Sequence, residues 1–599
     1  MRREDVLALY QGRLQERERE TAARKRKVDF VSYARLATFV AGVFFLWFVW
    51  ERARESWPLL AVPLVLFVVL LFVHARFHDA LTRAERAARF YRRGIERIEG
   101  SWQGKGRSGE VFLDRDHPYA RDLDVFGKGS LFELLATTVT SWGASTLARW
   151  LKEPATLDEV HLRQEAVKEL WPLVDLRERV ASEPAEGHEA TDSEALEKWA
   201  SSPPLFASLA GRWAAFVLGL ATTVLAILWL ASRVDRVVFL ASLAVSASFA
   251  LFFRGRTTAV LAAAEAPSRD LSLLASFLAI FESQSFRARH LVSLQGRLTG
   301  DGEPASSSIR RLAKLIEFLD ARRNQLFAPL AALLLWGTQF AFAIESWRAA
   351  SGRRVPRWLE AVGELDALLA LGSYGFENPD DVFPTTTEER AVLEAEGLGH
   401  PLIPPDRLVR NDVALGGLPE KPRLMVVSGS NMSGKSTLLR SLGVNAVLAL
   451  AGAPVRARRL NLSRLRVAAS IHVEDSLQDG ISHFYAEILR LRQVMELAKG
   501  DVPVLFLLDE ILHGTNSHDR RIGAEAVVRG LVDRGAIGLV TTHDLALSKL
   551  EETLSGRAKN VHFEDHLEDG KIRFDYRMRD GIVKKSNALE LMRGIGLEV

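Results

Sequence analysis

The stretch "MVVSGSNMSGKSTLLRSL", residues 425–442, constrains the fold of this 599-residue chain more than any other. Strand-like apolar residues precede Gly429, a helix-like segment follows Lys435, and the pattern between them is Gly-x-x-x-x-Gly-Lys-Ser. Such glycines let consecutive backbone N–H groups turn toward a phosphate at a helix N-terminus, where the helix dipole also favours anions. The lysine can then reach the β- and γ-phosphates, and the Ser436 hydroxyl can bind Mg²⁺. The stretch predicts a P-loop nucleotide site in an α/β domain.

Two later apolar segments end in residues suited to nucleotide hydrolysis. "VPVLFLLDE" ends in Asp509 and Glu510, and "IGLVTTHD" reaches His543. We expect Asp509 to hold Mg²⁺, Glu510 to orient or deprotonate the attacking water, and His543 to sense the γ-phosphate. Either segment alone could be an ordinary core strand of an α/β protein. In this order behind the P-loop, they predict an ATP site.

Four uncharged, apolar runs indicate that parts of the chain are suited to a lipid bilayer. They are Leu36–Trp50, Ser56–Val73, Trp213–Ser232 and Val237–Phe253. A helix needs roughly 20 apolar residues, and at least about 17, to cross the hydrocarbon core of a bilayer. The runs pair into two hairpins around the short turns "ERARE" and "RVDR". We therefore predict two transmembrane helical hairpins, with membrane lipid as a partner.

Basic residues flank both hairpins on one side, for example Arg24–Lys27 before the first and Arg254 after the second. The positive-inside rule then places these flanks in the cytoplasm. The expected location is the cell (inner) membrane, multi-pass, with the ATPase domain in the cytoplasm. The alternative is a pair of helical hairpins buried in a soluble core. A fifth uncharged run, 324–344, contains Gln325 and Gln339, and we expect a buried core helix there.

Composition excludes several classes of function. The chain has no cysteine, which removes disulfides, thiolate zinc sites and cysteine nucleophiles. Its formal net charge of +3 is too small to predict nucleic-acid binding by bulk attraction alone. The first 29 residues are charged throughout, so we expect no cleavable signal peptide.

The discriminating residues lie between the shared ATPase motifs. The loop reads "SGSNMSGKST", the acidic strand continues as "DEILHGTNSHD", and "IHVEDSLQDGISHFYAEI" lies between them. Together these segments resemble the MutS family of ATPases. The resemblance covers about 122–192 and 356–599, and is strongest in the ATPase part. It implies a MutS-type P-loop ATPase domain preceded by a mostly α-helical MutS-like core.

The resemblance also implies roles for individual residues. It assigns catalysis to Glu510, His543 and Ser482, with Ser482 reaching the γ-phosphate bound by the partner subunit of a homodimer. It assigns Mg²⁺ to Ser436 and Asp509. The nucleotide-binding residues it implies are Gly429, Ser430, Asn431, Met432, Ser433, Gly434, Lys435, Ser436, Thr437, Tyr576 and Leu408.

Some of these roles have plain alternatives. Ser482 could be an ordinary loop serine. Tyr576, at the position that stacks on adenine in the family, could equally be sheet core. Leu408 stands where relatives often place an aromatic residue, so base stacking from that side is expected to be weaker. Glu487 is expected to brace the Ser482 loop, and Asn411 with Asp412 to fix the chain near the base pocket.

The chain also departs from the family pattern. The first hundred residues show neither a mismatch-reading domain nor a Phe-x-Glu wedge, and the second hairpin stands where relatives carry a DNA clamp. DNA is therefore expected only as a partner bound without sequence preference. The basic run Arg456, Arg458, Arg459, Arg464 and Arg466 is expected to form a solvated face.

Two other functions compete with a membrane-anchored MutS-like ATPase. A transport ATPase of the ABC type would share the strands and membrane helices, but no L-S-G-G-Q precedes Asp509. A non-catalytic scaffold is disfavoured because Lys435, Glu510 and His543 are all present. The expected division is 1–35 charged helix, 36–76 first hairpin, 77–205 first part of the core, 206–255 second hairpin, 256–385 returning core and 386–599 ATPase domain.

Overall fold

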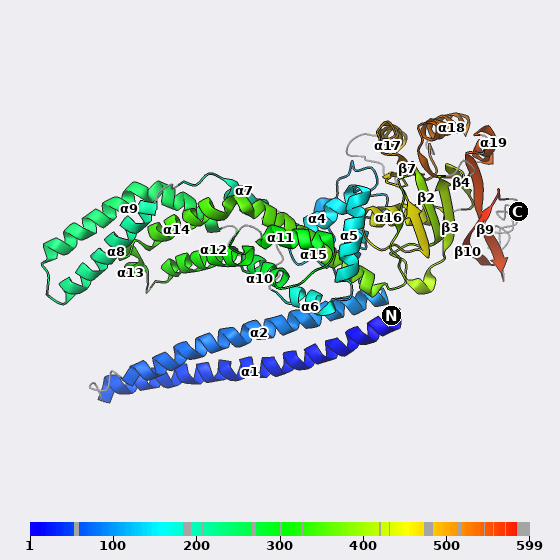
Figure 1. Cartoon of the computed structure of the whole chain (residues 1–599). Coiled ribbons are helices and arrows are strands. Elements are labelled where there is room, and N and C mark those ends of the chain that lie inside the picture. The colour runs from blue at the N-terminus through cyan, green and yellow to red at the C-terminus, as the bar shows by residue number, and fades with distance from the viewer. Residues whose placement is uncertain are drawn as a thin grey trace.

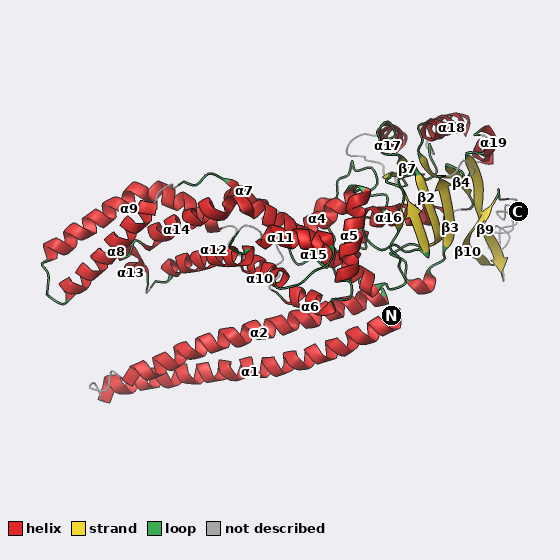
Figure 2. Cartoon of the chain, viewed as in Figure 1, coloured by secondary structure: helices red, strands yellow, loops and turns green. Residues whose placement is uncertain are grey.

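A computed structural model describes the chain in three parts, which are two projecting helical hairpins, a helical core and an α/β domain (Figures 1 and 2). The described residues are 1–52, 59–183, 193–205, 209–265, 271–299, 302–325, 327–417, 421–430, 432–471, 483–512, 517–543, 545–554, 556–568 and 571–583. Both hairpins extend away from the α/β domain toward the same side of the molecule (Figure 1).

The first hairpin consists of α1 (Arg3–Arg52) and α2 (Ala61–Glu99), which lie antiparallel along their length (Figure 1). Its base is held by a small core that contains Tyr10 of α1 and Phe376 of the central core helix. The Tyr10 ring occupies the space where a Cβ on Gly94 would lie, only 2.5 Å from a ring carbon. Glycine at 94 therefore lets the two helices approach closely.

Short helices form the core around one central helix. They are α3 (Leu131–Leu135), α4 (Ser141–Lys152), α5 (Leu157–Leu170), α6 (Val174–Ser182), α7 (Ser193–Ser201), α10 (Leu271–Glu282), α11 (Arg289–Thr299) and α12 (Ala305–Asp320). The central helix, α15 (Val355–Glu377), is buried over most of its length because its apolar residues cover every face. Its Asp366 accepts hydrogen bonds from the backbone N–H groups of Val139 and Thr140 and from the Thr140 hydroxyl, and so holds the start of α4.

The second hairpin consists of α8 (Leu209–Leu230) and α9 (Arg236–Glu265). Between its helices, the Thr222 hydroxyl lies 2.8 Å from that of Ser242 and 2.7 Å from that of Ser246. The hairpin packs on α13 (Ala328–Leu333) and α14 (Trp336–Ser351). The expectation of one helix over 324–344 was wrong. The helix is interrupted between α13 and α14, at Leu335, whose φ is +51°. The expected burial holds for α14, where Thr338, Ala341 and Ile344 are buried.

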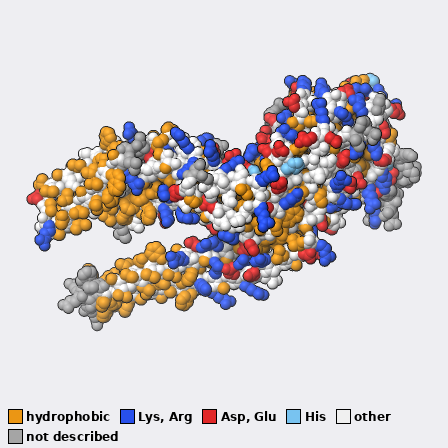
Figure 3. Space-filling model, viewed as in Figure 1, with side chains coloured by type: hydrophobic (Ala, Val, Ile, Leu, Met, Phe, Trp, Pro, Cys, Tyr) orange, Lys and Arg blue, Asp and Glu red, His pale blue; other side chains and the backbone are white. Residues whose placement is uncertain are grey.

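Four helices are long and apolar enough to cross a membrane, by length and composition alone. They are α1, α2, α8 and α9, and between 0% and 22% of each apolar window is buried. Figure 3 shows the hydrophobic side chains gathered on the projecting hairpins and the charged ones over the rest of the visible surface. The alternative of two hairpins buried in a core does not describe this structure. The apolar surfaces are instead outward-facing.

The α/β domain contains a six-stranded sheet in the order β10-β9-β4-β8-β7-β6. Its strands are β4 (Leu424–Ser428), β6 (Arg466–Ser470), β7 (Val504–Leu508), β8 (Ile537–Thr542), β9 (Ala558–Glu568) and β10 (Lys571–Asp580). All neighbours are parallel except β10 and β9. Strand alternation sends Met425 and Val427 to one face and Leu424 and Val426 to the other.

Helices cover both faces of this sheet. The helix after the P-loop, α16 (Lys435–Ala451), joins one face to the helical core, so both share one hydrophobic interior. The other face carries α17 (His483–Leu497) and α18 (Ser517–Asp533), and the short α19 (Leu550–Thr553) follows β8. A second sheet has the order β1-β5-β2-β3, with β1 (Thr385–Thr386), β2 (Val392–Leu398), β3 (Asn411–Gly416) and β5 (Arg459–Leu462).

The core segment around residue 120 contacts the α/β domain directly. Asp124 pairs with Arg440 of α16 at 2.6 Å, and Asp122 accepts a hydrogen bond from the backbone N–H of Ile471 just beyond β6. The basic run is only partly a solvated face. Arg456 is buried and pairs with Asp381 at 2.6 Å. This ion pair connects the segment after α15 to the segment after α16.

Candidate functional site

The P-loop connects the carboxyl end of β4 to the first turn of α16. Gly429 and Gly434 have φ values of +149° and +104°, in the region that L side chains rarely adopt. A Cβ on Gly429 would lie 2.9 Å from the Ser433 hydroxyl, so the loop also lacks room for a side chain there. Met432, with φ +70°, sits at the exposed tip. The loop is shaped to present backbone N–H groups at the α16 N-terminus.

Lys435 lies inside this loop and is 4% exposed. Its ammonium group donates to the carbonyl oxygens of Gly429 and Ser430 at 2.8 and 2.9 Å. Burial lowers the pKa of Lys435, while the negative charge of Glu510 acts in the opposite direction. A buried cation with a carboxylate 3.8 Å away provides a fixed positive charge for a phosphate.

Glu510 follows β7 in a left-handed backbone conformation, with φ +47°. One of its carboxylate oxygens lies 2.6 Å from Nε2 of His543, which follows the neighbouring strand β8. The same histidine nitrogen is 3.3 Å from Nζ of Lys435. Because β4, β7 and β8 are parallel neighbours, their carboxyl ends bring these three side chains together at one edge of the sheet.

Thr541 is a positioning residue that the sequence reading did not single out. Its hydroxyl donates to the carboxylate of Asp509 and accepts a hydrogen bond from the backbone N–H of Glu510 at 3.0 Å. The Asp509 backbone N–H donates to the Ser470 carbonyl at 2.9 Å. Both acidic residues are thus oriented from neighbouring strands. The available signal was the polar pair of threonines that ends the otherwise apolar β8.

Tyr576 lies over the P-loop from the last strand. It sits in an irregularity of the β9–β10 pairing with φ +54°, and its ring is 3.1 Å from where a Cβ on Gly434 would lie. The amide of Asn411 holds this irregularity, because it donates to the Tyr576 carbonyl at 3.1 Å and accepts from the Met578 N–H at 2.8 Å. The side chain is 44% exposed, so it is not sheet core.

The structure describes some of the remaining predicted residues and not others. Ser436 and Thr437 form the first turn of α16, and Leu408 packs against Gly399. Asn431 and Ser482 lie outside the described residues. Glu487 accepts a hydrogen bond from the backbone N–H of Leu512, just after the acidic strand. Asp412 accepts from the backbone N–H of Gly397 at 2.6 Å.

The residues present fit a nucleotide phosphate with Mg²⁺. The hydroxyls of Ser430 and Ser433 are buried and have no hydrogen-bond partner among the described residues. Buried polar groups are normally satisfied, so these two hydroxyls suit an incoming anion. No cluster of three or more His, Asp or Glu in the described chain is placed to hold a metal. Mg²⁺ is commonly held by one or two carboxylates, phosphate oxygens and water, which matches Asp509 and Ser436.

Comparisons with known proteins agree with this geometry. The sequence profile of MutS domain V matches residues 425–598. The chain is 34% identical over 260 residues to Endonuclease MutS2 of Thermus thermophilus, covering 42% of this chain and 32% of that protein. It is 32% identical over 252 residues to DNA mismatch repair protein MutS of Geobacillus thermodenitrificans, covering 41% and 27%. DNA mismatch repair protein MutS 2 of Haloarcula marismortui is 31% identical over 275 residues, covering 43% and 28%.

The chain thus spans no more than about a third of the length of these relatives. MutS domain V is an ATPase domain, so residues 425–598 form a MutS-type ATPase domain. This part relates the chain to the MutS and MutS2 proteins. Both apolar hairpins lie outside the profile match.

Proposed function

We propose that the chain is a membrane-anchored MutS-like ATPase whose cycle of ATP binding and hydrolysis opens and closes a homodimer. The observation that carries the proposal is the convergence of Lys435, Glu510 and His543 beside the P-loop. A phosphate cradle, a carboxylate and a histidine at one sheet edge are the parts that phosphoryl transfer to water requires.

Each residue has a distinct role in the proposed reaction. Lys435 neutralises the β- and γ-phosphates, and Ser436 and Asp509 would hold Mg²⁺, which would supply further positive charge. Glu510 takes a proton from water as the water oxygen bonds to the γ-phosphorus. The bond from that phosphorus to the bridging oxygen breaks at the same centre, leaving ADP and phosphate. His543 donates to Glu510 or the γ-phosphate and so links the base to the state of the nucleotide.

The dimer is proposed from the resemblance to the MutS family. In the MutS resemblance, Ser482 of one subunit reaches the nucleotide of the other, so two composite sites form per dimer. The Glu487 carboxylate is buried beside the acidic strand, and the resemblance assigns it the role of bracing the Ser482 loop. Tyr576 over Gly434 is suited to stack on the adenine, while Leu408 offers only an apolar contact.

The membrane part of the proposal rests on the four apolar helices. Their side chains face outward, as in Phe72 and Phe252, which are 70% and 80% exposed. Contiguous apolar surface of this extent is typical of contact with lipid. Under the positive-inside rule, the basic flanks favour an orientation with the ATPase domain in the cytoplasm, at the inner face of the cell membrane. We infer that the hairpins take the place of DNA-reading parts.

DNA is retained as a partner bound without sequence preference. Its contacts would come mainly from phosphates and should weaken steeply as salt rises. An ABC-type transport function remains the alternative that the exposed helices favour. The match to MutS domain V and the missing L-S-G-G-Q support the MutS-like reading instead.

One set of assays tests the proposal. The full chain, purified in detergent, is assayed for ATP hydrolysis with and without Mg²⁺, and with matched, mismatched and branched DNA. We expect Mg²⁺-dependent hydrolysis and a preference for mismatched over matched duplex of no more than a few-fold at fixed salt. Absence of hydrolysis under all conditions would overturn the ATPase, and a strong mismatch preference would reveal a recognition element.

A further inference from the structure

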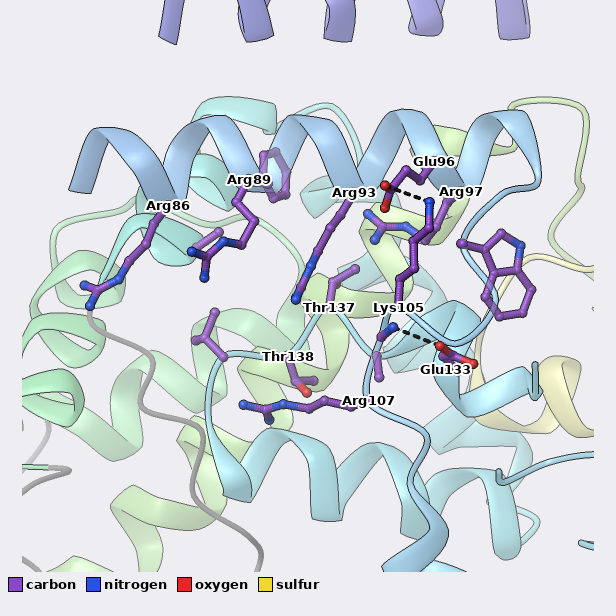
Figure 4. Close-up of a pocket in the computed structure, with 16 residues that line it drawn as sticks. Arg86, Arg89, Arg93, Glu96, Arg97, Lys105, Arg107, Glu133, Thr137 and Thr138 are labelled. Atoms are coloured by element: carbon purple, nitrogen blue, oxygen red, sulfur yellow. Dashed lines mark hydrogen bonds and ion pairs between the residues drawn. The ribbon is translucent and has the colours of Figure 1, made fainter. Parts of the chain in front are cut away.

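A basic cavity of about 150 Å³ lies between α2 and the loops that lead into α3 and α4 (Figure 4). It is well above the ~10–15 Å³ that a single water needs. Cationic side chains reach it from two directions. They are Arg86, Arg89, Arg93 and Arg97 from α2 and Lys105 and Arg107 from the facing loop. None of the residues that line the cavity belongs to the P-loop.

The acidic residues nearby are already engaged. Arg97 is paired with Glu377, and Lys105 with Glu96 at 2.9 Å. The Glu133 carboxylate accepts from the backbone N–H groups of Gly106 and Gly129 at 2.8 and 2.6 Å. These contacts leave the cavity with cations that its own carboxylates do not neutralise.

Four arginines supply the excess charge. They are Arg86, Arg89, Arg93 and Arg107, and none forms an ion pair within the part of the chain that the structure describes. The three on α2 point toward the cavity, and Arg107 reaches it from the opposite wall (Figure 4). The pKa of Arg93 is lowered, first by partial removal from water and then by the charges of Arg89 and Arg97. Like charges held together in this way favour a bound anion.

A hydroxyl completes the set of donors. Thr138 is 6% exposed, lines the cavity, and its Oγ1 has no hydrogen-bond partner among the described residues. Buried hydroxyls are normally hydrogen-bonded, so this one suits an incoming acceptor. Guanidinium groups bind phosphate through two parallel hydrogen bonds, and a hydroxyl donates a further one. The arrangement suits several phosphate oxygens at once.

We propose that this cavity binds a small compound carrying two or more phosphate charges. A soluble phosphate compound and a phospholipid headgroup share this chemistry. The exposed apolar part of α2 includes Phe72, which precedes Arg86, the nearest α2 residue of the cavity lining, by 14 positions. At 1.5 Å per helical residue, the two lie about 21 Å apart along α2. A headgroup at the end of the apolar segment would not reach the cavity, so the ligand is soluble.

The cavity is also connected to the interior of the molecule. Val139 of its lining donates to Asp366 of α15, and Arg97 pairs with Glu377 at the end of the same helix. The side-chain oxygen of Asn378, the next residue, accepts a hydrogen bond from the Arg456 guanidinium at 2.8 Å. A ligand that draws α2 toward the facing loop would therefore act on the helix that leads to the ATPase domain.

Inorganic pyrophosphate is the probe for a direct test. Calorimetric titration uses the full chain in detergent in a Lys435→Ala background, which removes binding at the P-loop. We expect one pyrophosphate per chain, with affinity falling as salt rises. The double variant Arg93→Gln/Arg107→Gln should bind at least tenfold more weakly. Arg92→Gln is the matched control, because Arg92 lies on the same helix but outside the cavity lining and pairs with Glu18.

The outcomes are distinct. Unchanged affinity in the double variant, or no binding to the Lys435→Ala chain, would overturn the proposal. Thr138→Val is a second variant, which keeps every charge and serves as the test if the double variant fails to fold. It should weaken pyrophosphate binding severalfold. The titration is repeated in nanodiscs of phosphatidylcholine and of phosphatidylglycerol. Equal affinity in both supports a soluble ligand, whereas loss in phosphatidylglycerol alone would assign the cavity to a lipid headgroup.

Discussion

Arg97 of α2 donates to both carboxylate oxygens of Glu377 at the end of α15, each at 2.6 Å. The side chains are 11% and 2% exposed, so this is a buried two-point contact between the first hairpin and the central helix. Removing one partner of a buried pair typically costs about 3–5 kcal/mol, because the other charge is left without compensation. The contact ties the movement of the hairpin base to the helix that leads into the ATPase domain.

We therefore predict that Arg97→Leu lowers the melting temperature of the detergent-solubilised chain by several degrees. The double variant Arg97→Leu/Glu377→Leu should recover most of that loss, since no charge is left buried alone. Arg92→Gln, which removes only an exposed pair, is the control and should change little. If Arg97→Leu melts like the wild type, the pair does not hold the hairpin.

A second prediction concerns the acidic strand. Glu510→Gln should nearly abolish Mg²⁺-dependent hydrolysis while nucleotide binding survives. The amide keeps the size of the side chain but cannot accept the proton of the attacking water. Hydrolysis is measured by phosphate release and binding by a fluorescent nucleotide. Hydrolysis at the wild-type rate would show that another group is the base.

Much of the ATPase fold could be predicted because its signals are local. Each motif can be recognised from a short stretch of sequence. These motifs are the P-loop between a strand and a helix, and the two strands that end in Asp509–Glu510 and His543. Contacts between distant segments could not be read this way. Thr541 acts on Asp509 from the next strand, and Arg456 is buried only because Asp381 meets it.

The helical part shows the same limit. The four apolar runs are visible in the sequence, but the break at Leu335 depends on how α13 and α14 pack around the second hairpin. The arginines of α2 read as a basic membrane flank. Only the fold brings Arg107 and Thr138 opposite Arg93, so that these residues line one cavity.

A third prediction uses the buried Asp366. Burial raises the pKa of Asp366 to about 6, whereas an unfolded aspartate titrates near ~3.9. Between these pH values the folded chain holds a proton that the unfolded chain has lost. The contribution of this group to stability therefore falls by about 3 kcal/mol in total as the pH rises from below the unfolded pKa to above the folded pKa, with most of the loss between pH 4 and 6.

This dependence is measured against Asp366→Asn, which cannot titrate. The melting temperature of the wild type relative to the variant should be highest near pH 4 and should decline to a plateau above pH 6. Glu360→Gln controls for the loss of a carboxylate from the same helix, because Glu360 is exposed. A wild-type advantage that grows as the pH rises would contradict the assignment.

A fourth prediction concerns the two hairpins. The full chain should sediment with membranes and resist extraction by high salt or alkali, because its hairpins satisfy their backbone polar groups internally and expose apolar side chains. Detergent should release it. Recovery in the soluble fraction without detergent would show that the apolar surfaces are covered by protein instead of lipid.

The last prediction addresses the dimer. If Ser482 acts on the nucleotide of the partner subunit, then neither subunit completes its own site. A hydroxyl adds a donor to charge that grows in the transition state, and losing one such donor typically costs on the order of 3 kcal/mol, or about a hundredfold in rate.

Subunits carrying Lys435→Ala are mixed with subunits carrying Ser482→Ala. In a mixed dimer, the intact P-loop belongs to the Ser482→Ala chain and the intact serine that faces it belongs to the Lys435→Ala chain. One complete site then forms, so hydrolysis should exceed that of either variant alone. Affinity tags of two kinds establish that mixed dimers are present. Mixed dimers without recovered activity would place the Ser482 hydroxyl outside the partner's site, because the only complete set of parts in that dimer spans both chains.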